Sequence, residues 1–363
     1  MSKCVLIMAG GTGGHVFPAL AVARELLSQG VEVRWLGTRK GIESRIVPEA
    51  GLAISYISVN GLRGKGLKGW LLAPVNLSVA LIQAIRICLS IKPGVVLGMG
   101  GFASGPGGIA SWLLRFPLVI QEQNAVAGLT NRLLSRFARR VLEGFPDSFS
   151  ASVKTEHTGN PVRDDIQSLG APDGRYQQRH DSPIRLLIVG GSLGALALNE
   201  VVPEAVAKMS ESLRPEIWHQ TGKGKKLSTA RDYIRLGVEA RVDEFIDDMA
   251  AAYQWADIVV CRAGALTISE LTMAGLASIL VPYPHAVDDH QTRNALYLSE
   301  AGAARLMLQT ELSEEHLSQV LSELVSEGRN TMLNIAKQAY AMSKPDATKR
   351  VAQVCLEVMH DGK

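Results

Sequence analysis

The sequence predicts an α/β protein with two doubly wound domains, each built on a parallel sheet. Apolar runs rich in Val, Ile and Leu alternate with helical patterns from end to end, which is typical of parallel strands covered on both faces. Each half opens with an apolar strand that runs into a glycine loop. The 363 residues exceed the roughly 250–300 at which a single core stops growing. With 47% hydrophobic residues, the composition excludes a disordered chain.

Nine apolar runs fit buried strands. In the first half, they are Cys4–Met8, Val31–Leu36, Ile54–Val59, Val95–Leu97 and Leu118–Ile120. In the second half, they are Ile184–Val189, Glu216–His219, Ile258–Cys261 and Ser278–Val281. A turn-forming linker at Gly159–Pro161 separates the two sets, so we predict domains at 1–161 and 162–342. Ligands of open α/β sheets bind outside the carboxyl ends of strands, which predicts a cleft between two such domains.

The net charge of +3 hides an asymmetry between the halves. Residues 1–161 hold 17 Lys and Arg against 8 Asp and Glu, a net +9, whereas residues 162–363 carry a net −6. A basic half suits a negatively charged partner. Four isolated cysteines, with no CxxC pair or Cys/His cluster, indicate reduced thiols and argue against a disulfide framework or a structural zinc site.

Two apolar stretches raise the question of a membrane span. Met1–Ala9 is too short for a secretory signal and is interpreted as a buried strand. The stretch 70–91 is long enough to cross a bilayer but contains polar residues that a lone span tolerates poorly, such as Gln83 and Arg86. Because its apolar residues follow helical spacing, we predict a packed helix instead. That stripe consists of Leu71, Leu72, Val75, Val79, Ile82, Ile85 and Leu89.

Glycine loops at Gly10–Gly14 and Gly190–Gly194 hold corresponding positions in the two halves. Such loops let backbone approach an anion while a helix N-terminus offers N–H groups and partial positive charge, which favours a phosphate or diphosphate ligand. Purely structural turns are the alternative. The dinucleotide fingerprint fails because Val16 replaces its third glycine, and no P-loop string occurs. A third stretch, Gly98–Gly108, suits close approach of a ligand or another backbone, or a hinge loop.

Several polar side chains are candidates for binding a diphosphate without a metal, since no Asp-x-Asp motif occurs. Arg163, Ser192 and the helix after Gly264 could meet its charge. Glu270 could accept hydrogen bonds from a ribose diol, and a solvated helix-start glutamate is the alternative. No metal or cofactor is predicted.

Two histidines, His15 and His290, are candidates for roles in the site. His15 directly follows the first glycine loop and is a candidate general base, with capping or packing as the alternative. His290 lacks the partner cluster of a metal ligand and fits a polar turn that faces sugar or phosphate.

The first half also carries an edge that is both apolar and basic. Loop 61–68 holds three cations, and further clusters lie at Trp112–Arg115 and Arg132–Arg140. Apolar side chains ringed by cations suit attachment to an anionic membrane surface. Core packing with a solvated basic face is the alternative. No nucleic-acid recognition motif accompanies the cations, and we predict no nucleic-acid partner.

An ordered set of strings spans the chain from about Met8 to Ala352: GGTGGHVFPALAVA, GLRGKG, GMGGFASGPGG, EQNAVAGLTN, GNPVR, VGGSLGA, EFIDDMAAAY, RAGALTISE and DDHQTRNAL. This set resembles the MurG family of bacterial peptidoglycan synthesis. Enzymes of that family transfer N-acetylglucosamine from UDP-N-acetylglucosamine to lipid-linked muramoyl-pentapeptide (lipid I), which gives lipid II.

The resemblance implies a GT-B fold, with two Rossmann-like domains facing across a cleft and a final helix, about 343–363, packed back on the first domain. It implies an inverting, metal-independent transfer to the acceptor 4-hydroxyl, forming a β-1,4 link. The first domain would bind the acceptor and the membrane, and the second the UDP-sugar. The protein would be peripheral, on the cytoplasmic face of the inner membrane.

The resemblance also implies roles for individual residues. The loop of Ser192 would hold the diphosphate with help from Arg163, Ile246 would meet uracil through its backbone, and Glu270 would bind the ribose. His15 and Glu122 fall where the family places residues important for catalysis or acceptor binding. The residues that would flank the nucleotide are Ala265, Leu266, Thr267, Ile268 and Ser269. The residues that would complete the donor site near the sugar are Thr12, Gly13, Gly14, Asn124 and Gln291.

Two positions depart from the family pattern. Gln121 stands where His often precedes Glu-Gln-Asn, and Phe102 stands where Tyr often follows the glycine pair. The second change removes a hydroxyl. Two other functions stay open: a related GT-B UDP-sugar transferase with another lipid or small-molecule acceptor, and a non-catalytic UDP-sugar-binding protein at the membrane.

Overall fold

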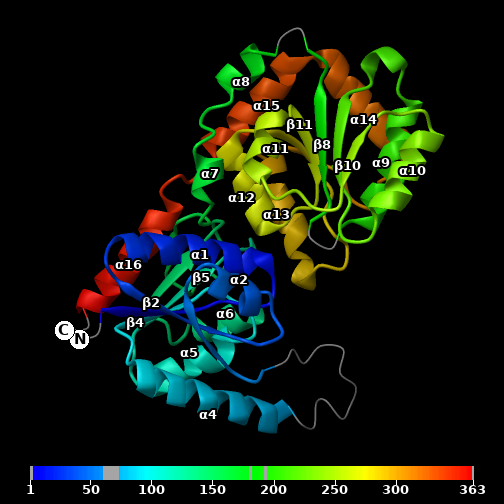
Figure 1. Ribbon diagram of the computed structural model, residues 1–363. Helices are drawn as coiled ribbons and strands as arrows, with labels where there is room; N and C mark the ends of the chain where they lie inside the picture. The colour runs from blue at the N-terminus through cyan, green and yellow to red at the C-terminus, as the bar shows by residue number, and fades with distance from the viewer. Residues whose placement is uncertain (1–2, 60–72, 180–181, 192–193, 362–363) are drawn as a thin grey trace. The chain divides into compact units, whose positions relative to one another are not determined.

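The computed structural model describes residues 3–59, 73–179, 182–191 and 194–361 (Figure 1). The chain forms two compact units. Unit 1 comprises Met1–Arg163 and Lys344–Lys363, and unit 2 comprises Asp164–Ser343. Each unit has its own all-parallel sheet between layers of helices, which confirms the predicted doubly wound α/β class.

Unit 1 contains a seven-stranded sheet in the order β3-β2-β1-β4-β5-β6-β7. The order reverses between β1 and β4, which is where open α/β sheets leave a crevice at their carboxyl ends. Its strands are β1 (Cys4–Met8), β2 (Glu32–Gly37), β3 (Ala53–Tyr56), β4 (Val95–Gly98), β5 (Leu118–Glu122), β6 (Arg140–Glu143) and β7 (Thr155–His157). Its helices are α1 (Gly13–Ser28), α2 (Glu43–Glu49), α4 (Ala73–Ile91), α5 (Ser104–Leu113), α6 (Leu129–Leu134) and α16 (Ala347–Asp361).

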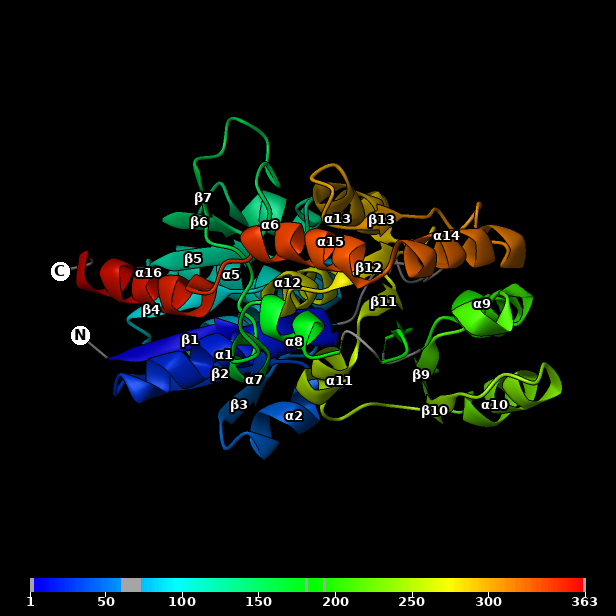
Figure 2. The same cartoon turned by 90° about the horizontal axis from the view of Figure 1, so that it is seen from above.

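Alternate residues of β1 build two cores on opposite faces of the unit 1 sheet. Val5 and Ile7 pack in the core with α1 and α16, while Leu6 and Met8 pack in the core with α4 and α5. Helices α1 and α16 lie side by side (Figures 1 and 2). Arg350 of α16 also binds Glu156 of β7, with Nε 2.5 Å from the carboxylate oxygen. The last helix is therefore an integral part of unit 1.

Helix α4 packs through small residues rather than through its large apolar ones. Its buried positions are Ala73, Ala80, Ala84 and Cys88, which let the helix approach its neighbours closely. The stripe predicted to be the packed face is instead exposed at four positions: Val75, Val79, Ile82 and Leu89. The helix is predicted correctly, but its predicted burial is wrong at these four positions. Ile85 of the same stripe is half-buried against the core, and Leu71 and Leu72 lie outside the described residues. Among the described residues, α4 is also the one helix long and apolar enough to cross a membrane.

Unit 2 contains a six-stranded sheet in the order β10-β9-β8-β11-β12-β13. Its strands are β8 (Arg185–Val189), β9 (Glu216–Gln220), β10 (Arg241–Asp243), β11 (Ile258–Cys261), β12 (Ala277–Leu280) and β13 (Arg305–Leu306). Its helices are α7 (Asp164–Gln167), α8 (Asp173–Gln177), α9 (Leu196–Lys208), η1 (Glu211–Leu213), α10 (Lys226–Arg235), α11 (Met249–Trp255), α12 (Ala265–Ala274), η2 (Val287–Asp289), α13 (His290–Ser299), α14 (Glu314–Glu327) and α15 (Arg329–Ala341).

The core of unit 2 lies between β8 and the helices on one side of the sheet. Leu186 and Ile188 of β8 pack with apolar residues of α9, α10 and α14. Helix α14 runs beside α9 in both views (Figures 1 and 2), while α11 and α12 lie on the other side of the sheet in Figure 1. The glycine loop after β8 therefore starts from a rigid central strand.

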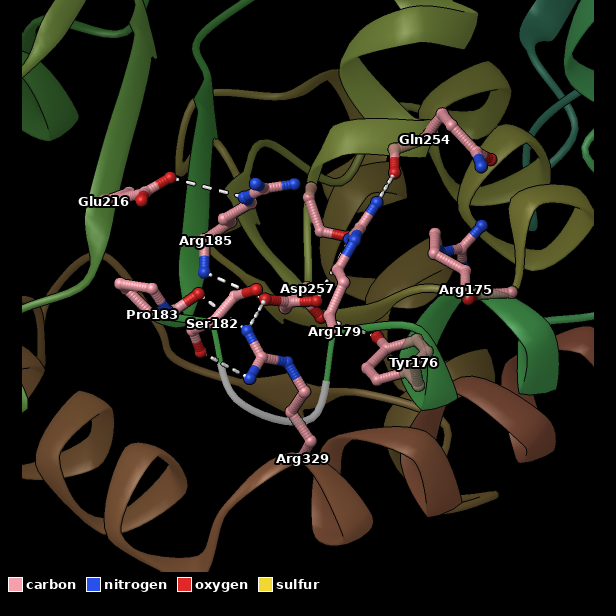
Figure 3. A network of polar contacts seen from close by, with 12 residues as sticks. Arg175, Tyr176, Arg179, Ser182, Pro183, Arg185, Glu216, Gln254, Asp257 and Arg329 are labelled. Carbon is pink, nitrogen blue, oxygen red and sulfur yellow. Dashed lines mark hydrogen bonds and ion pairs between the residues drawn. The ribbon is translucent and has the colours of Figure 1, made fainter.

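A buried carboxylate, Asp257, organises the amino-terminal edge of the unit 2 sheet (Figure 3). Its side chain is fully buried and accepts hydrogen bonds from Arg179 Nη1 at 3.1 Å, Arg329 Nη2 at 2.9 Å and the backbone N–H of Arg185 at 3.0 Å. Tyr176 donates from its hydroxyl to the Asp257 carbonyl at 2.6 Å. One aspartate thus joins α8, α15 and the starts of β8 and β11.

Candidate active site

The first glycine loop and the third glycine-rich stretch pack against each other at the carboxyl ends of β1 and β4. A side chain at Gly101 would collide with the carbonyl of Gly10. One at Gly100 would collide with the imidazole of His15. Close approach of another backbone, one of the alternatives for this stretch, therefore accounts for Gly101, whereas Gly100 leaves room for the His15 side chain.

His15 lies in the first turn of α1 with its ring half-buried. Thr12 caps the helix in extended backbone, and its carbonyl accepts the N–H of His15 at 3.2 Å. The Thr12 hydroxyl lies 3.3 Å from His15 Nδ1. Gly13 and Gly14 are half-buried residues of the same turn. The imidazole is thus held on two sides, by Thr12 and by the Gly100 backbone.

Glu122 ends β5 and is buried, with four hydrogen bonds to its carboxylate. Oε1 accepts from the backbone N–H of Asn124 at 3.0 Å and from its side-chain amide at 3.1 Å. Oε2 accepts from the N–H of Gly128 at 3.0 Å and from the amide of Asn131 at 2.8 Å. Four donors saturate a carboxylate, so this geometry suits holding loop 123–131 in place better than removing a proton.

The two departures from the family pattern have different surroundings. Gln121 is buried in a network of amides: its Nε2 donates to Asn160 Oδ1 at 2.9 Å, and its Oε1 accepts from Gln123. The side chain of Phe102 is 54% exposed, so the ring stands at the surface beside the glycine pair.

In unit 2 the second glycine loop is fixed by the strand next to it. Gln220, at the end of β9, donates from its amide to the carbonyls of Gly191 at 3.0 Å and Glu244 at 3.2 Å. A side chain at Gly194 would collide with the carbonyl of Thr221. Ser192, the residue expected to hold diphosphate, lies outside the described residues.

A buried polar cluster supports the carbonyl against which Gly194 packs. Asn199 of α9 donates to the Thr221 carbonyl at 3.0 Å, and its Oδ1 lies 3.1 Å from His219 Nε2. His219 Nδ1 lies 2.9 Å from the Tyr233 hydroxyl. Burial lowers the pKa of His219 to about 3, so the imidazole is neutral at physiological pH. The cluster acts as a rigid support under the loop.

The expected ribose ligand, Glu270, is positioned by a tyrosine. Its side chain is 8% exposed, which excludes the solvated glutamate considered as the alternative. The Tyr253 hydroxyl of α11 donates to Glu270 Oε2 at 3.0 Å. Ile246 is buried in the segment between β10 and α11. The expected uracil and ribose contacts therefore come from neighbouring segments of unit 2.

The N-terminus of α12 carries the residues expected to flank the nucleotide. Gly264 caps the helix, and Asn294 donates to the carbonyl of Ala263 at 3.1 Å, which fixes the entry to the helix. The helix residues concerned are Ala265 and Ile268, which are buried, and Leu266, Thr267 and Ser269, which are half-buried.

The remaining expected site residues lie as follows. Arg163 is half-buried at the end of the first segment of unit 1. Gln291 accepts the N–H of Tyr283 at 2.9 Å on its Oε1, and His290 Nδ1 lies 2.6 Å from the Val287 carbonyl. In the described part of the chain, no three His, Cys, Asp or Glu side chains gather as they would around a metal.

Within each unit, the expected residues that the structure describes lie at or after the carboxyl ends of strands. Sequence reasoning missed the side chains behind them: Glu43, Gln220 and Tyr253. Glu43 and Gln220 belong to none of the quoted motifs, and Tyr253 is the last residue of EFIDDMAAAY, a position to which no role was assigned. The sequence signals that could have identified these residues are weak: Glu43 is an acid in the helix after β2, and Gln220 and Tyr253 are polar residues in segments that are otherwise apolar.

Comparison with known proteins agrees with this architecture. Residues 5–143 match the glycosyltransferase family 28 N-terminal domain, and residues 185–351 match the glycosyltransferase family 28 C-terminal domain. The crystal structure of Acinetobacter baumannii MurG superposes with a TM-score of 0.84 at 41% identity and covers 98% of this chain and 99% of that one. A calicheamicin glycosyltransferase, at 16% identity and a TM-score of 0.67, shares the fold.

Two bacterial relatives are similar along nearly their whole length. Both are named UDP-N-acetylglucosamine–N-acetylmuramyl-(pentapeptide) pyrophosphoryl-undecaprenol N-acetylglucosamine transferase. The protein of Chromohalobacter salexigens is 53% identical over 359 residues, covering 99% of this chain and 98% of the relative. That of Aeromonas hydrophila is 54% identical over 355 residues, covering 98% and 97%.

Two doubly wound units, each with a glycine loop after its first strand, define an enzyme of the GT-B glycosyltransferase class. The GT-B fold implied by the sequence resemblance is confirmed. The relatives narrow the class further: the chain belongs to the MurG family within glycosyltransferase family 28.

Proposed function

We propose that this enzyme transfers N-acetylglucosamine from UDP-N-acetylglucosamine to the 4-hydroxyl of a lipid-linked N-acetylmuramoyl-pentapeptide, with inversion at the anomeric carbon. The product is lipid II, a precursor of peptidoglycan. The observation that carries the proposal is the 53% identity, along 99% of this chain, to a transferase named for this donor and acceptor. Residues 162–342 would bind the donor. Residues 1–161, with the final helix, would bind the acceptor and the membrane.

The donor site would lie at the carboxyl edge of the unit 2 sheet. Glu270 would accept hydrogen bonds from the ribose diol, because its carboxylate is already oriented by the Tyr253 hydroxyl. Ile246 would present backbone to uracil. The second glycine loop with Ser192, the N-terminus of α12 and Arg163 would meet the diphosphate charge.

The chemical step would be a direct displacement. The acceptor hydroxyl attacks the anomeric carbon, the bond to the UDP oxygen breaks, and UDP leaves with the bonding electron pair. His15 would accept the proton of the attacking hydroxyl. Glu122 would act by holding Asn124 in place rather than as the base, since its carboxylate is saturated by four donors.

The decisive measurement is UDP release with and without lipid I. We expect release from UDP-N-acetylglucosamine only when lipid I is present. A Glu270→Ala control should raise the KM for the donor at least about 10-fold, since hydrogen bonds to a charged group contribute about 1.5–3 kcal/mol each. Binding of the donor without UDP release would indicate a non-catalytic binding protein. Release with another acceptor but not with lipid I would indicate a different transferase.

We propose in addition that unit 1 attaches to an anionic membrane surface. Helix α4 packs along α5, and α5 contacts α6. These helices and the segment after α6 expose large apolar side chains: Val75, Leu77, Val79, Ile82, Leu89, Trp112, Leu113, Leu129, Leu133 and Phe137. Exposed cations accompany them at Arg86, Lys92, Arg115, Arg132, Arg136 and Arg139. This combination suits a peripheral protein of the cytoplasmic membrane face, where anionic lipids attract basic residues.

Reversing two of these charges tests the attachment. Arg132→Glu combined with Arg136→Glu should weaken binding to vesicles containing anionic lipid at least about 30-fold, because each basic residue near such a surface contributes about 1 kcal/mol. Co-sedimentation with vesicles measures the effect, which should shrink at high salt. The basic loop at Lys65 and Lys68, expected to contribute, lies outside the described residues.

The matched control reverses two exposed cations of unit 2, Lys223→Glu with Arg231→Glu. It changes the net charge of the protein by the same amount and should leave vesicle binding unchanged. Equal weakening by both double variants would mean that net charge, and not this surface, determines binding.

A further inference from the structure

A buried carboxylate lies beside the first glycine loop and is not part of any motif. Glu43 belongs to α2, and its side chain is fully buried. Its Oε2 accepts the backbone N–H of Gly11 at 2.9 Å. Its Oε1 accepts the backbone N–H of Thr38 at 2.9 Å and the Thr38 hydroxyl at 2.7 Å. Within the described residues its charge is met by these donors and not by a cation, so the hydrogen bonds must be kept for the carboxylate to stay buried.

The surrounding backbone is shaped to admit this carboxylate. Side chains at Gly10 and Gly41 would collide with the carboxyl group of Glu43, and one at Gly37 would lie 2.7 Å from its Cγ. These glycines come from the ends of β1 and β2 and from the turn before α2. Glycine at these places therefore makes room for an acid of the chain itself. The N–H of Gly11, which the sequence predicts to face a ligand anion, is already donated to Glu43.

A short chain of contacts connects Glu43 to the imidazole of His15. Gly11 precedes Thr12, whose carbonyl accepts the N–H of His15 and whose hydroxyl lies 3.3 Å from its ring nitrogen. On the other side, the backbone of Gly100 lies against the ring. Movement of the loop at Gly11 would therefore move both the cap of α1 and the ring.

We propose that Glu43 is a positioning residue: it acts as an internal anion that closes the first glycine loop and so fixes the His15 side chain. This inference rests on the proposed role of His15 in the transfer. It assigns the two glycine loops different tasks, because the first is occupied by the enzyme's own carboxylate while the second serves the diphosphate.

The test is Glu43→Gln, which keeps size and one acceptor but sets an NH₂ group against the N–H of Gly11 or Thr38. We expect kcat to fall about 10- to 100-fold, as small misplacements of catalytic groups do, while the KM for UDP-N-acetylglucosamine stays within about twofold. The control is Glu49→Gln, an exposed glutamate of the same helix, which should leave both constants unchanged. Unchanged kcat in folded Glu43→Gln would overturn the inference.

Pairing this change with His15→Ala separates positioning from general loss of structure. In the His15→Ala background, Glu43→Gln should cost less than about threefold, since the group it positions is gone. An equal loss in both backgrounds would show a structural role and overturn the inference. If His15→Ala alone retains turnover, the proposed role of His15 fails and this inference fails with it.

Two milder substitutions at Thr38 test the same inference if Glu43→Gln does not fold. Thr38→Val removes the hydroxyl donor at nearly constant volume, and Thr38→Ser keeps it. We expect Thr38→Val to lower kcat about three- to tenfold through one lost hydrogen bond and Thr38→Ser to restore it. The same kcat for both variants would count against the inference.

Discussion

Replacing His15 with alanine should lower kcat by about 100- to 10,000-fold, the contribution usual for a positioned acid or base. The KM for UDP-N-acetylglucosamine should stay within about twofold, because the proposed contacts to uracil and ribose come from Ile246 and Glu270 and not from His15. The ring is held between the Thr12 hydroxyl and the Gly100 backbone, so its loss removes a group in a fixed position. Steady-state kinetics with lipid I as acceptor measures both constants.

The control for this substitution is His316→Ala, an exposed histidine of α14 in unit 2. It should leave both constants unchanged. Turnover within about threefold of the parent enzyme in His15→Ala would be incompatible with general-base catalysis by this imidazole. The carboxylate of Glu122 would not then take its place without first losing hydrogen bonds to Asn124, Gly128 and Asn131.

Replacing Asp257 with alanine should lower the free energy of unfolding of unit 2 by about 3–5 kcal/mol, because it leaves buried guanidinium groups without their counter-charge. Arg179 and Arg329 both bind this carboxylate, and their side chains are only 12% and 10% exposed (Figure 3). Urea unfolding followed by circular dichroism measures the change. The donor KM of the folded fraction should not move, because Asp257 lies at the opposite end of the strands from the glycine loop.

An exposed ion pair provides the comparison for Asp257. Asp232 and Arg235 of α10 approach to 3.4 Å at the surface, where such a pair contributes less than about 1 kcal/mol. Asp232→Ala should therefore have little effect on unfolding. If the two variants unfold at the same urea concentration, the Asp257 network does not stabilise the unit.

The central strands were predictable because burial on both faces leaves a plain signal in sequence. Cys4–Met8 and Ile258–Cys261 are continuous apolar runs, and their bounds in the structure are those predicted. The strands that sequence reasoning missed, such as Thr155–His157 and Arg241–Asp243, are three residues long and polar or charged. Their conformation comes from pairing with a neighbour, which no local pattern records.

The residues of the candidate site also fall into a group that the sequence predicts and a group that it does not. The glycine loops and the helix after Gly264 follow central strands, so their place at the carboxyl edge of each sheet follows from topology. The positions of the residues that hold these loops do not follow from topology. Glu43 meets Gly11 across 32 positions of sequence, and Tyr253 meets Glu270 between two helices. The burial of the apolar stripe of α4 was wrongly predicted for a related reason. Periodicity identifies the apolar face of a helix but does not show whether protein covers that face.

The return of α16 to unit 1 has a consequence for synthesis on the ribosome. Val351, Val354, Cys355 and Val358 belong to the same core as Val5 and Ile7 of β1. That core cannot close until residues 347–361 have emerged, whereas every strand of unit 2 is available before then. The part synthesised first is thus completed last, and in the interval its nascent apolar face needs protection from aggregation.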